Sequence, residues 1–223
     1  MSRWQFAREL FDEHFRPLRE AGYELERAAS HQHYREVHDR ELGSHFPAEV
    51  FFDLGALRTE AEREGQKRLA EARGGEPLSD FTIVRQGGAV VAVFSGAQQT
   101  DALYRMWHSN VHRDHRRKGI YRMIVDGTIR YTQALGFDSI TSEHAPCNNA
   151  ILVAKLRAGF YIYSLETDPC VGPSVVLRYF HNPEHRAAFE LRCGMATLTP
   201  GLRAQGTGAW ERFREQVTGE AKE

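Results

Sequence analysis

The chain has few cysteines, no long apolar run and almost no net charge, and each of these features excludes a class of protein. Its three cysteines are odd in number, and none forms a Cys-x-x-Cys pair. The cysteines therefore indicate neither a disulfide framework nor a zinc site. No stretch of about eighteen apolar residues occurs, and the start has no apolar run of signal-peptide length. We expect a cytoplasmic protein with no membrane segment.

The charge balance argues against a nucleic-acid-binding protein. The formal net charge is -1, with 26% charged and 41% hydrophobic residues among 223, which is an ordinary globular composition. The one basic turn, residues 113–122, offers too few cations to neutralise many backbone phosphates. We expect no nucleic-acid partner. A chain of this length favours one large α/β domain with extra segments attached to it.

The first half of the chain changes from helical to β periodicity near Phe81. Apolar spacing and the capping residue Ser30 predict the helices. Two β-rich runs flank Gly87-Gly88, which strongly indicates a hairpin. The expected elements are a helix over 3–19, a short strand over 23–28, helices over 30–42 and 58–73, and strands over 81–85, 89–95 and 102–111.

A cationic turn follows the last of these strands. Positions 113–118 are Arg, His or Lys except for Asp114, and Gly119 then opens a helical pattern that runs to about Leu135. A helix start leaves backbone N–H groups without partners and carries about half a positive charge, so this pattern predicts an anion site, most simply for phosphate. This segment lacks the lysine and hydroxyl spacing of a P-loop, and it lacks the three glycines of a dinucleotide-binding fingerprint.

A further strand, 137–142, lies parallel to 102–111 if the intervening helix is a crossover. The carboxyl ends of parallel strands beside a helix N-terminus are where α/β sheets bind ligands. The sequence therefore places the anion site at one end of a parallel strand pair. Closing strands are expected over 161–165 and 175–180, and helices near 183–192 and 210–217.

Two segments resemble the GCN5-related N-acetyltransferase (GNAT) superfamily. Arg116 and Gly119 fit its pyrophosphate loop, Arg or Gln, two residues, Gly, one residue, Gly or Ala, although Tyr121 departs from the last position. Asn148, followed by Lys155 and then Gly-Phe, is similar to the family's fourth-helix segment. The resemblance implies an α/β (α+β) fold: a mixed, mostly antiparallel sheet whose central parallel strand pair splays around a CoA cleft, flanked by helices.

The resemblance covers roughly residues 23–180, which we expect to form the acetyltransferase domain. Residues 1–22 are then an N-terminal helical extension. Residues 181–223 are a C-terminal helical extension packed on the same domain, where they cover a sheet edge or make a homodimer contact.

Acetyl-CoA is the co-substrate that the family implies, with no metal. His112 and His115 have metal-like spacing but no third ligand pattern. In the family the pantetheine arm pairs with the strand that enters the loop, and the loop amides hold the pyrophosphate. The residues expected to bind CoA here are Ser109, Asn110, Val111, Arg116, Arg117, Lys118, Gly119, Ile120, Tyr121, Arg122 and Asn148.

The acid and base are harder to assign. The family often places a tyrosine acid where this chain has Lys155, and some relatives use a glutamate base where it has Arg105. Nearby groups within reach are His108, His112, Glu143 and His144, with Tyr161 as an alternative acid. The catalytic candidates are therefore His108, Glu143, Lys155 and Tyr161.

Two functions follow from the resemblance. One is an acyl-CoA-dependent N-acyltransferase that moves acetyl to an amine of a small molecule or a protein by direct attack. The other is a non-catalytic acyl-CoA-binding protein of the same fold, which the unusual residues at Lys155 and Arg105 favour.

Overall fold

A computed structural model describes residues 4–45, 60, 76–169, 172–195 and 199–204. The chain divides into two compact units, Met1–Tyr179 and Phe180–Glu223, and each is described by itself. The helices expected over 58–73, apart from Glu60, and near 210–217 lie outside the described residues. No helix in the described ranges is both long enough and apolar enough to cross a membrane.

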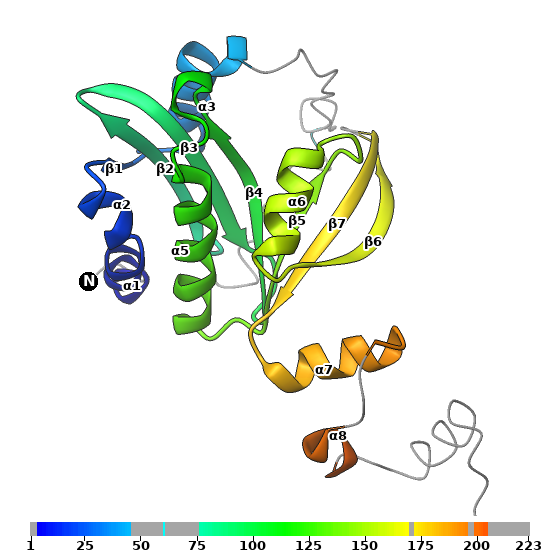
Figure 1. Cartoon of the computed structure of the whole chain (residues 1–223). Coiled ribbons are helices and arrows are strands. Elements are labelled where there is room, and N and C mark those ends of the chain that lie inside the picture. The colour runs from blue at the N-terminus through cyan, green and yellow to red at the C-terminus, as the bar shows by residue number, and fades with distance from the viewer. Residues whose placement is uncertain (1–3, 46–59, 61–75, 170–171, 196–198, 205–223) are drawn as a thin grey trace, which may run out of the picture. The chain divides into compact units, whose positions relative to one another are not determined.

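The first unit is built on a seven-stranded mixed sheet (Figure 1). Its order is β1-β2-β3-β4-β5-β7-β6, and β4 and β5 pair in parallel whereas the sequential pairs β1–β2, β2–β3, β3–β4 and β6–β7 are antiparallel. This confirms the predicted mostly antiparallel sheet with one parallel pair. The strands are β1 (Glu24–Arg27), β2 (Ser79–Gln86), β3 (Ala89–Gln98), β4 (Leu103–Val111), β5 (Ser139–His144), β6 (Tyr161–Asp168) and β7 (Gly172–Phe180).

Five α-helices accompany this sheet among the described residues, and two of them, α3 and α6, begin at a side-chain cap. Ser30 accepts a hydrogen bond from His33 N at 3.0 Å and so caps its helix as predicted. The first predicted helix is two helices, because the chain breaks at Phe15 and Pro17 falls in the first turn of the second. The helices are α1 (Gln5–His14), α2 (Arg16–Glu20), α3 (His31–Glu41), α5 (Ile120–Ala134) and α6 (Asn149–Arg157).

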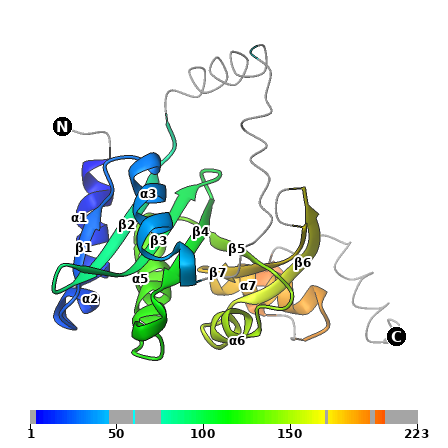
Figure 2. The same ribbon diagram turned by 90° about the horizontal axis from the view of Figure 1, so that it is seen from above.

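Apolar clusters cover both faces of the sheet. Successive residues of a strand point to opposite faces. Val84 and Phe94 belong to a large cluster with α1 and α5, whereas their neighbours Ile83 and Val93 belong to a smaller cluster with Tyr34 of α3. Helices α1 and α5 therefore cover one face and α3 the other. Figures 1 and 2 show α5 and α6 on the same side of the sheet.

Close approach of α1 to α5 depends on one glycine. A Cβ added at Gly127 would lie 2.8 Å from the ring of Phe15, which stacks on Phe11 and Phe94. Only a residue without a side chain fits there. The contact joins the N-terminal helices to the crossover helix between the two parallel strands.

A buried carboxylate, Asp80, joins four elements beside these aromatic rings. Asp80 of β2 accepts hydrogen bonds from the hydroxyls of Tyr104 at 2.9 Å and Tyr131 at 3.2 Å, and it pairs with Arg27 at 3.3 Å. Burial raises the pKa of Asp80, and Arg27 and the two hydroxyls partly offset that effect. This cluster links β1, β2, β4 and α5.

The second unit contains two described helices, α7 (Pro183–Arg192) and α8 (Pro200–Ala204). The side chain of Asn182 accepts from Glu184 N at 2.8 Å and caps α7. The helix predicted over 183–192 is confirmed.

Candidate functional site

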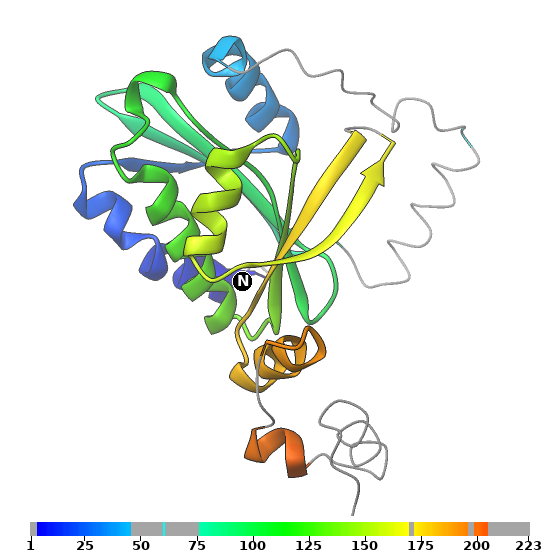
Figure 3. The same cartoon turned by 45° about the vertical axis from the view of Figure 1, so that its right-hand side comes forward.

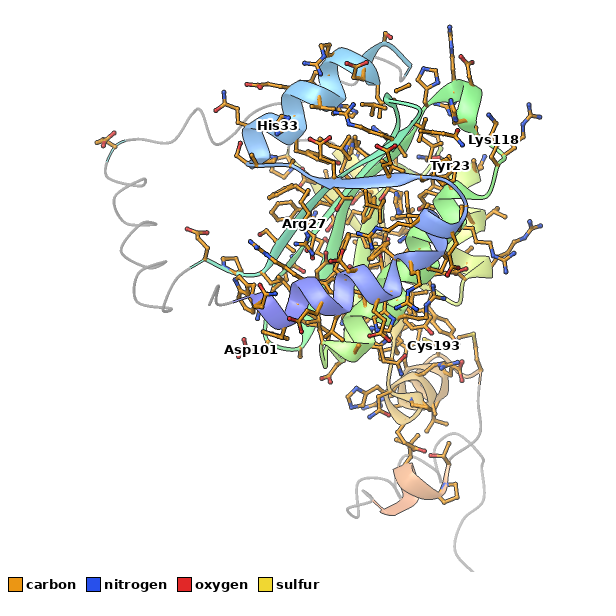
Figure 4. The ribbon with its side chains drawn as sticks, turned by 90° about the vertical axis from the view of Figure 1, so that its left-hand side faces the viewer. Tyr23, Arg27, His33, Asp101, Lys118 and Cys193 are labelled. Carbon is orange, nitrogen blue, oxygen red and sulfur yellow. The ribbon has the colours of Figure 1, made fainter. Side chains whose placement is uncertain are left out.

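The cationic turn before α5 presents its basic side chains to solvent. A single 3-10 turn (Arg113–His115) leads from β4 into an exposed run of Arg116, Arg117 and Lys118. Figure 4 labels Lys118 in this loop. Two residues have left-handed backbone, Arg117 with φ 62° and Gly119 with φ 82°. Alternation of this kind folds a loop into a concave row of amides that suits an anion.

The first turn of α5 faces this loop. The amides of the first four helical positions have no intrahelical partner, and the helix dipole adds positive potential there. Gly119 is the N-cap, and no heavy atom lies within 4 Å of where its Cβ would be. The space beside the Gly119 Cα is therefore open to an anion. Ile120, by contrast, is a buried core residue, so it offers only its backbone.

The strands β4 and β5 separate at Met106. They pair in register from Leu103 to Met106 against 139–142, whereas β4 continues to Val111. Beyond Met106 this edge of β4 has no neighbouring strand among the described residues. Figure 3 shows the yellow strands β6 and β7, which lie beyond β5, splaying away from the green strands β2 to β4.

A β-bulge lies at the point of separation. Ser95 of β3 pairs with His108, but Gly96 pairs with Met106, so Trp107 is an extra residue in β4. Bulges bend a strand and increase its twist. The bulge thus accounts for the direction that β4 takes after it leaves β5.

The register between β3 and β4 determines which backbone N–H and C=O groups of β4 point toward the space where β4 and β5 separate. The amide of His112 donates to the carbonyl of Val91 at 2.9 Å, and Ala92 opposes Val111. Because antiparallel ladders alternate, the N–H and C=O groups of Ser109 and Val111 point away from β3. One of them, the Val111 carbonyl, accepts from Arg116 Nε at 3.2 Å.

Helix α6 begins at a side-chain cap beside the site. The carboxamide oxygen of Asn148 accepts from Ile151 N at 3.4 Å, so this predicted CoA ligand has an observed capping role. One side of α6 carries Lys155 into the core, where its side chain is 1% exposed.

Lys155 is buried without a carboxylate among its described contacts. Its Nζ lies 2.7 Å from Met106 Sδ and 4.2 Å from the ring centre of Phe160. Desolvation lowers the pKa of Lys155 to about 7. Burial, followed by the charge of Lys155, lowers the pKa of His144 to about 4. A neutral imidazole and a readily deprotonated amine thus lie near the residue where the strands part.

Glu143 is held in an ion pair. Its carboxylate lies 2.7 Å from the guanidinium of Arg105, with side chains 20% and 30% exposed. The pair bridges β5 and β4. Arg105 thus occupies the Glu143 carboxylate in an ion pair across the two parallel strands.

A hydrogen-bonded cluster, here called the α3 histidine cluster, joins α3 to β4. It consists of Tyr34, His38 and Asp39 from α3, and His108 and Asn110 from β4. Asn110 Nδ2 lies 2.8 Å from the Nε2 atoms of both histidines. His108 Nδ1 lies 2.8 Å from the Tyr34 hydroxyl, and His38 Nδ1 lies 2.8 Å from Asp39 Oδ1.

These contacts define the tautomers of both rings. An amide nitrogen only donates and an ionised carboxylate only accepts. Both Nε2 atoms therefore accept from Asn110, and the hydrogens of His38 and His108 lie on Nδ1. Burial, with smaller contributions from His38 and Arg35, lowers the pKa of His108 to about 4. His108 is thus neutral at pH 7.

Solved structures resemble this arrangement. Ard1 from Thermoplasma volcanium matches with a TM-score of 0.50 and 14% identity over 71% of this chain and 97% of its own. The ribosomal-protein-S18-alanine N-acetyltransferase from Escherichia coli matches at 0.50 and 13%, over 71% and 93%. The protein yncA from Salmonella typhimurium, solved with its cofactor acetyl-CoA, matches at 0.50 and 13%, over 73% and 95%. The chain has the GNAT fold. The sequence itself matches no protein-family model and no curated protein.

The GNAT fold brings most predicted site residues to one region. The loop 116–122, the open edge of β4 at 109–111 and Lys155 of α6 lie around the point where β4 and β5 part. Tyr161 does not join them in the sheet order, because it begins the edge strand β6 and β7 lies between β6 and β5. Among the described residues, no group of three or more His, Cys, Asp or Glu could hold a metal ion.

Sequence reasoning missed His38 and Asp39. They lie on α3, about 70 residues before the strand that they contact, so no local spacing could reveal the pairing. The signal that was available is the adjacent His-Asp pair on the polar side of a predicted helix.

Proposed function

We propose that this protein is an acyl-CoA-dependent N-acyltransferase that transfers acetyl from acetyl-CoA to an amine of a small molecule or a protein. The open edge of β4 beside the bare N-terminus of α5 carries this proposal. Extended backbone groups and an anion site, side by side, fit the pantetheine arm and the pyrophosphate of CoA. The acceptors named for related folds differ, so the acceptor here is left at the level of an amine.

The donor side uses backbone more than side chains. The amides of Ser109 and Val111 hydrogen-bond the pantetheine arm and the thioester carbonyl, which becomes more negative during attack. One such donor contributes about 3 kcal/mol in a site that excludes water. Asn110 directs its backbone to β3 and serves through its side chain instead. The α5 amides bind the pyrophosphate, with charge supplied by Arg116, Arg117, Lys118 and Arg122.

Lys155 acts as the proton donor to the departing thiolate. Its Nζ lies at the point where β4 and β5 part, and its low pKa makes the proton easy to release. The unbranched Met106 side chain covers this nitrogen and is flexible enough to move when the thioester enters. Glu143 and Tyr161 have no step in this mechanism, because one is ion-paired and the other lies in the edge strand.

Two measurements test the proposal. Calorimetry with CoA and acetyl-CoA should show binding that Gly119→Trp abolishes and Gly136→Trp preserves. Both glycines have left-handed backbone with no atom near the Cβ position, at opposite ends of α5, so the two variants suffer similar strain. Free CoA should then be released from acetyl-CoA in the presence of a suitable amine. Binding without release across an amine panel would favour the non-catalytic acyl-CoA-binding alternative, and no binding would exclude both.

A further inference from the structure

The α3 histidine cluster has features of a proton-accepting site on the sheet face opposite Lys155. Lys155 contacts Met106 and Phe160, which belong to the large apolar cluster on the α5 face. Tyr34 belongs to the smaller cluster on the α3 face. Asn110 lies between Ser109 and Val111, whose amides point away from β3. Its side chain lies on the α3 face, where it hydrogen-bonds the imidazoles of His38 and His108.

We propose that His38, held by Asp39, is the general base that takes the proton from the acceptor amine. This inference rests on the proposed function and adds the base to it. The acceptor approaches from the α3 face, and its N–H replaces the Asn110 amide as the donor to His38 Nε2.

The direction of attack follows from the strand geometry. A thioester carbonyl that accepts from a β4 amide lies close to the plane of the sheet, as a peptide carbonyl does in a paired strand. The two faces of its trigonal carbon therefore point to the two faces of the sheet. The α5 face carries α5, α6 and Lys155, whereas the α3 face carries the α3 histidine cluster, whose His38 is 12% exposed, so the amine is assigned to the α3 face.

The step balances with groups already in place. The amine lone pair forms the C–N bond while its proton moves to His38 Nε2, and the resulting imidazolium donates through Nδ1 to the Asp39 carboxylate. The C–S bond then breaks, and the thiolate takes a proton from Lys155. The proton on His38 returns to solvent on the exposed side of Asp39, whose side chain is 60% exposed.

His38 fits the role of base better than His108. Protonation of His108 would place a charge beside the buried Tyr34, and burial lowers the pKa of His108 to about 4. His38 is 12% exposed and has a carboxylate on its far nitrogen to stabilise the cation. Among the contacts of the described residues, the charged and titratable groups that face His38 include Asp39 of α3 and His108 of β4, and Arg35 lies 3.9 Å from Asp39.

The test compares His38→Gln with His33→Gln. Glutamine at 38 can still accept from Asn110 but has no basic nitrogen. His33 lies on the same helix outside the cluster, and Figure 4 labels it. The probe reaction is CoA release from acetyl-CoA across a panel of primary amines. We expect kcat/KM to fall about 100- to 1,000-fold in His38→Gln, in the usual range for loss of a general base, with CoA affinity unchanged and His33→Gln like wild type.

The pH profile separates a base from a positioning residue. With rates expressed per neutral amine, kcat/KM of the wild type should still depend on pH through the base, and this dependence should be absent in His38→Gln. Asp39→Asn should lower kcat/KM with CoA affinity unchanged, because the imidazolium that forms on His38 loses its carboxylate. Equal activity of His38→Gln and wild type overturns this inference and leaves the transferase proposal standing. A pH dependence per neutral amine that persists unchanged in His38→Gln also overturns it. CoA binding without transfer to any amine overturns both.

Discussion

Replacing Lys155 by methionine tests the most unusual feature of the core. The side chain is 1% exposed, its described contacts are a thioether and an aromatic ring, and methionine matches its length. A buried ammonium with such partners opposes folding, because both contacts suit an apolar side chain at least as well. We expect Lys155→Met to be more stable than wild type at neutral pH.

The magnitude follows from the pKa. Burial lowers the pKa of Lys155 from its ordinary 10.5 to about 7. At about 1.4 kcal/mol for each tenfold change in proton affinity, the burial of this group costs up to about 5 kcal/mol at low pH. Between the two pKa values the unfolded chain binds more protons than the folded chain, so the stability of wild type rises with pH. From pH 6.5 to pH 9 the rise due to Lys155 is about 2.5 kcal/mol.

Urea denaturation at several pH values measures this effect. The stability advantage of Lys155→Met over wild type should be largest at pH 6.5 and should shrink by about 2.5 kcal/mol at pH 9. Lys118→Met is the matched control, because Lys118 is exposed in the loop before α5, and its stability should run parallel to that of wild type. An advantage that stays constant within about 0.5 kcal/mol over this range would refute the reasoning, since Lys155 would then titrate as an exposed lysine.

Three further changes should lower stability in urea denaturation. Tyr131→Phe removes a hydroxyl that donates to buried Asp80 and should cost about 1 to 2 kcal/mol; no loss would mean that Asp80 is satisfied without it. Gly127→Val forces a side chain into the aromatic ring packed 2.8 Å from the Cβ position and should cost about 1 to 3 kcal/mol. Ser30→Ala removes the cap on His33 N and should cost about 1 kcal/mol, and a neutral result would show that solvent replaces the cap.

Local patterns were enough to predict most of the fold. The Gly87-Gly88 pair has positive φ at both positions, 57° and 81°, as a two-residue hairpin turn requires. Ser30 caps α3, and Gly119 begins α5, because capping depends on residues within one turn of each other. The parallel pairing of β4 and β5 followed from the crossover helix between them. Each of these features depends on short-range chemistry that a sequence displays directly.

The site's acid and base depend on contacts that a sequence does not display. The burial of Lys155 arises because Met106, 49 residues earlier, and Phe160 close over it. The Arg105–Glu143 pair forms because β4 and β5 are neighbours in the sheet. The separation of these strands also depends on the bulge at Trp107, which exists only in the pairing of β4 with Ser95 and Gly96 of β3.

The same desolvation that destabilises the fold makes Lys155 useful in the proposed reaction. A thiol has an ordinary pKa near 8.5, so an exposed lysine with an ordinary pKa near 10.4 would hold its proton more tightly than the departing thiolate. With its pKa lowered to about 7, Lys155 instead transfers the proton in the favourable direction. A tyrosine at this position has an ordinary pKa near 10 and is a weaker acid than this lysine. The lysine can therefore take the place of a tyrosine as the proton donor only while it is buried. The stability cost that Lys155→Met is expected to reveal thus has the same origin as the proposed chemistry of the site.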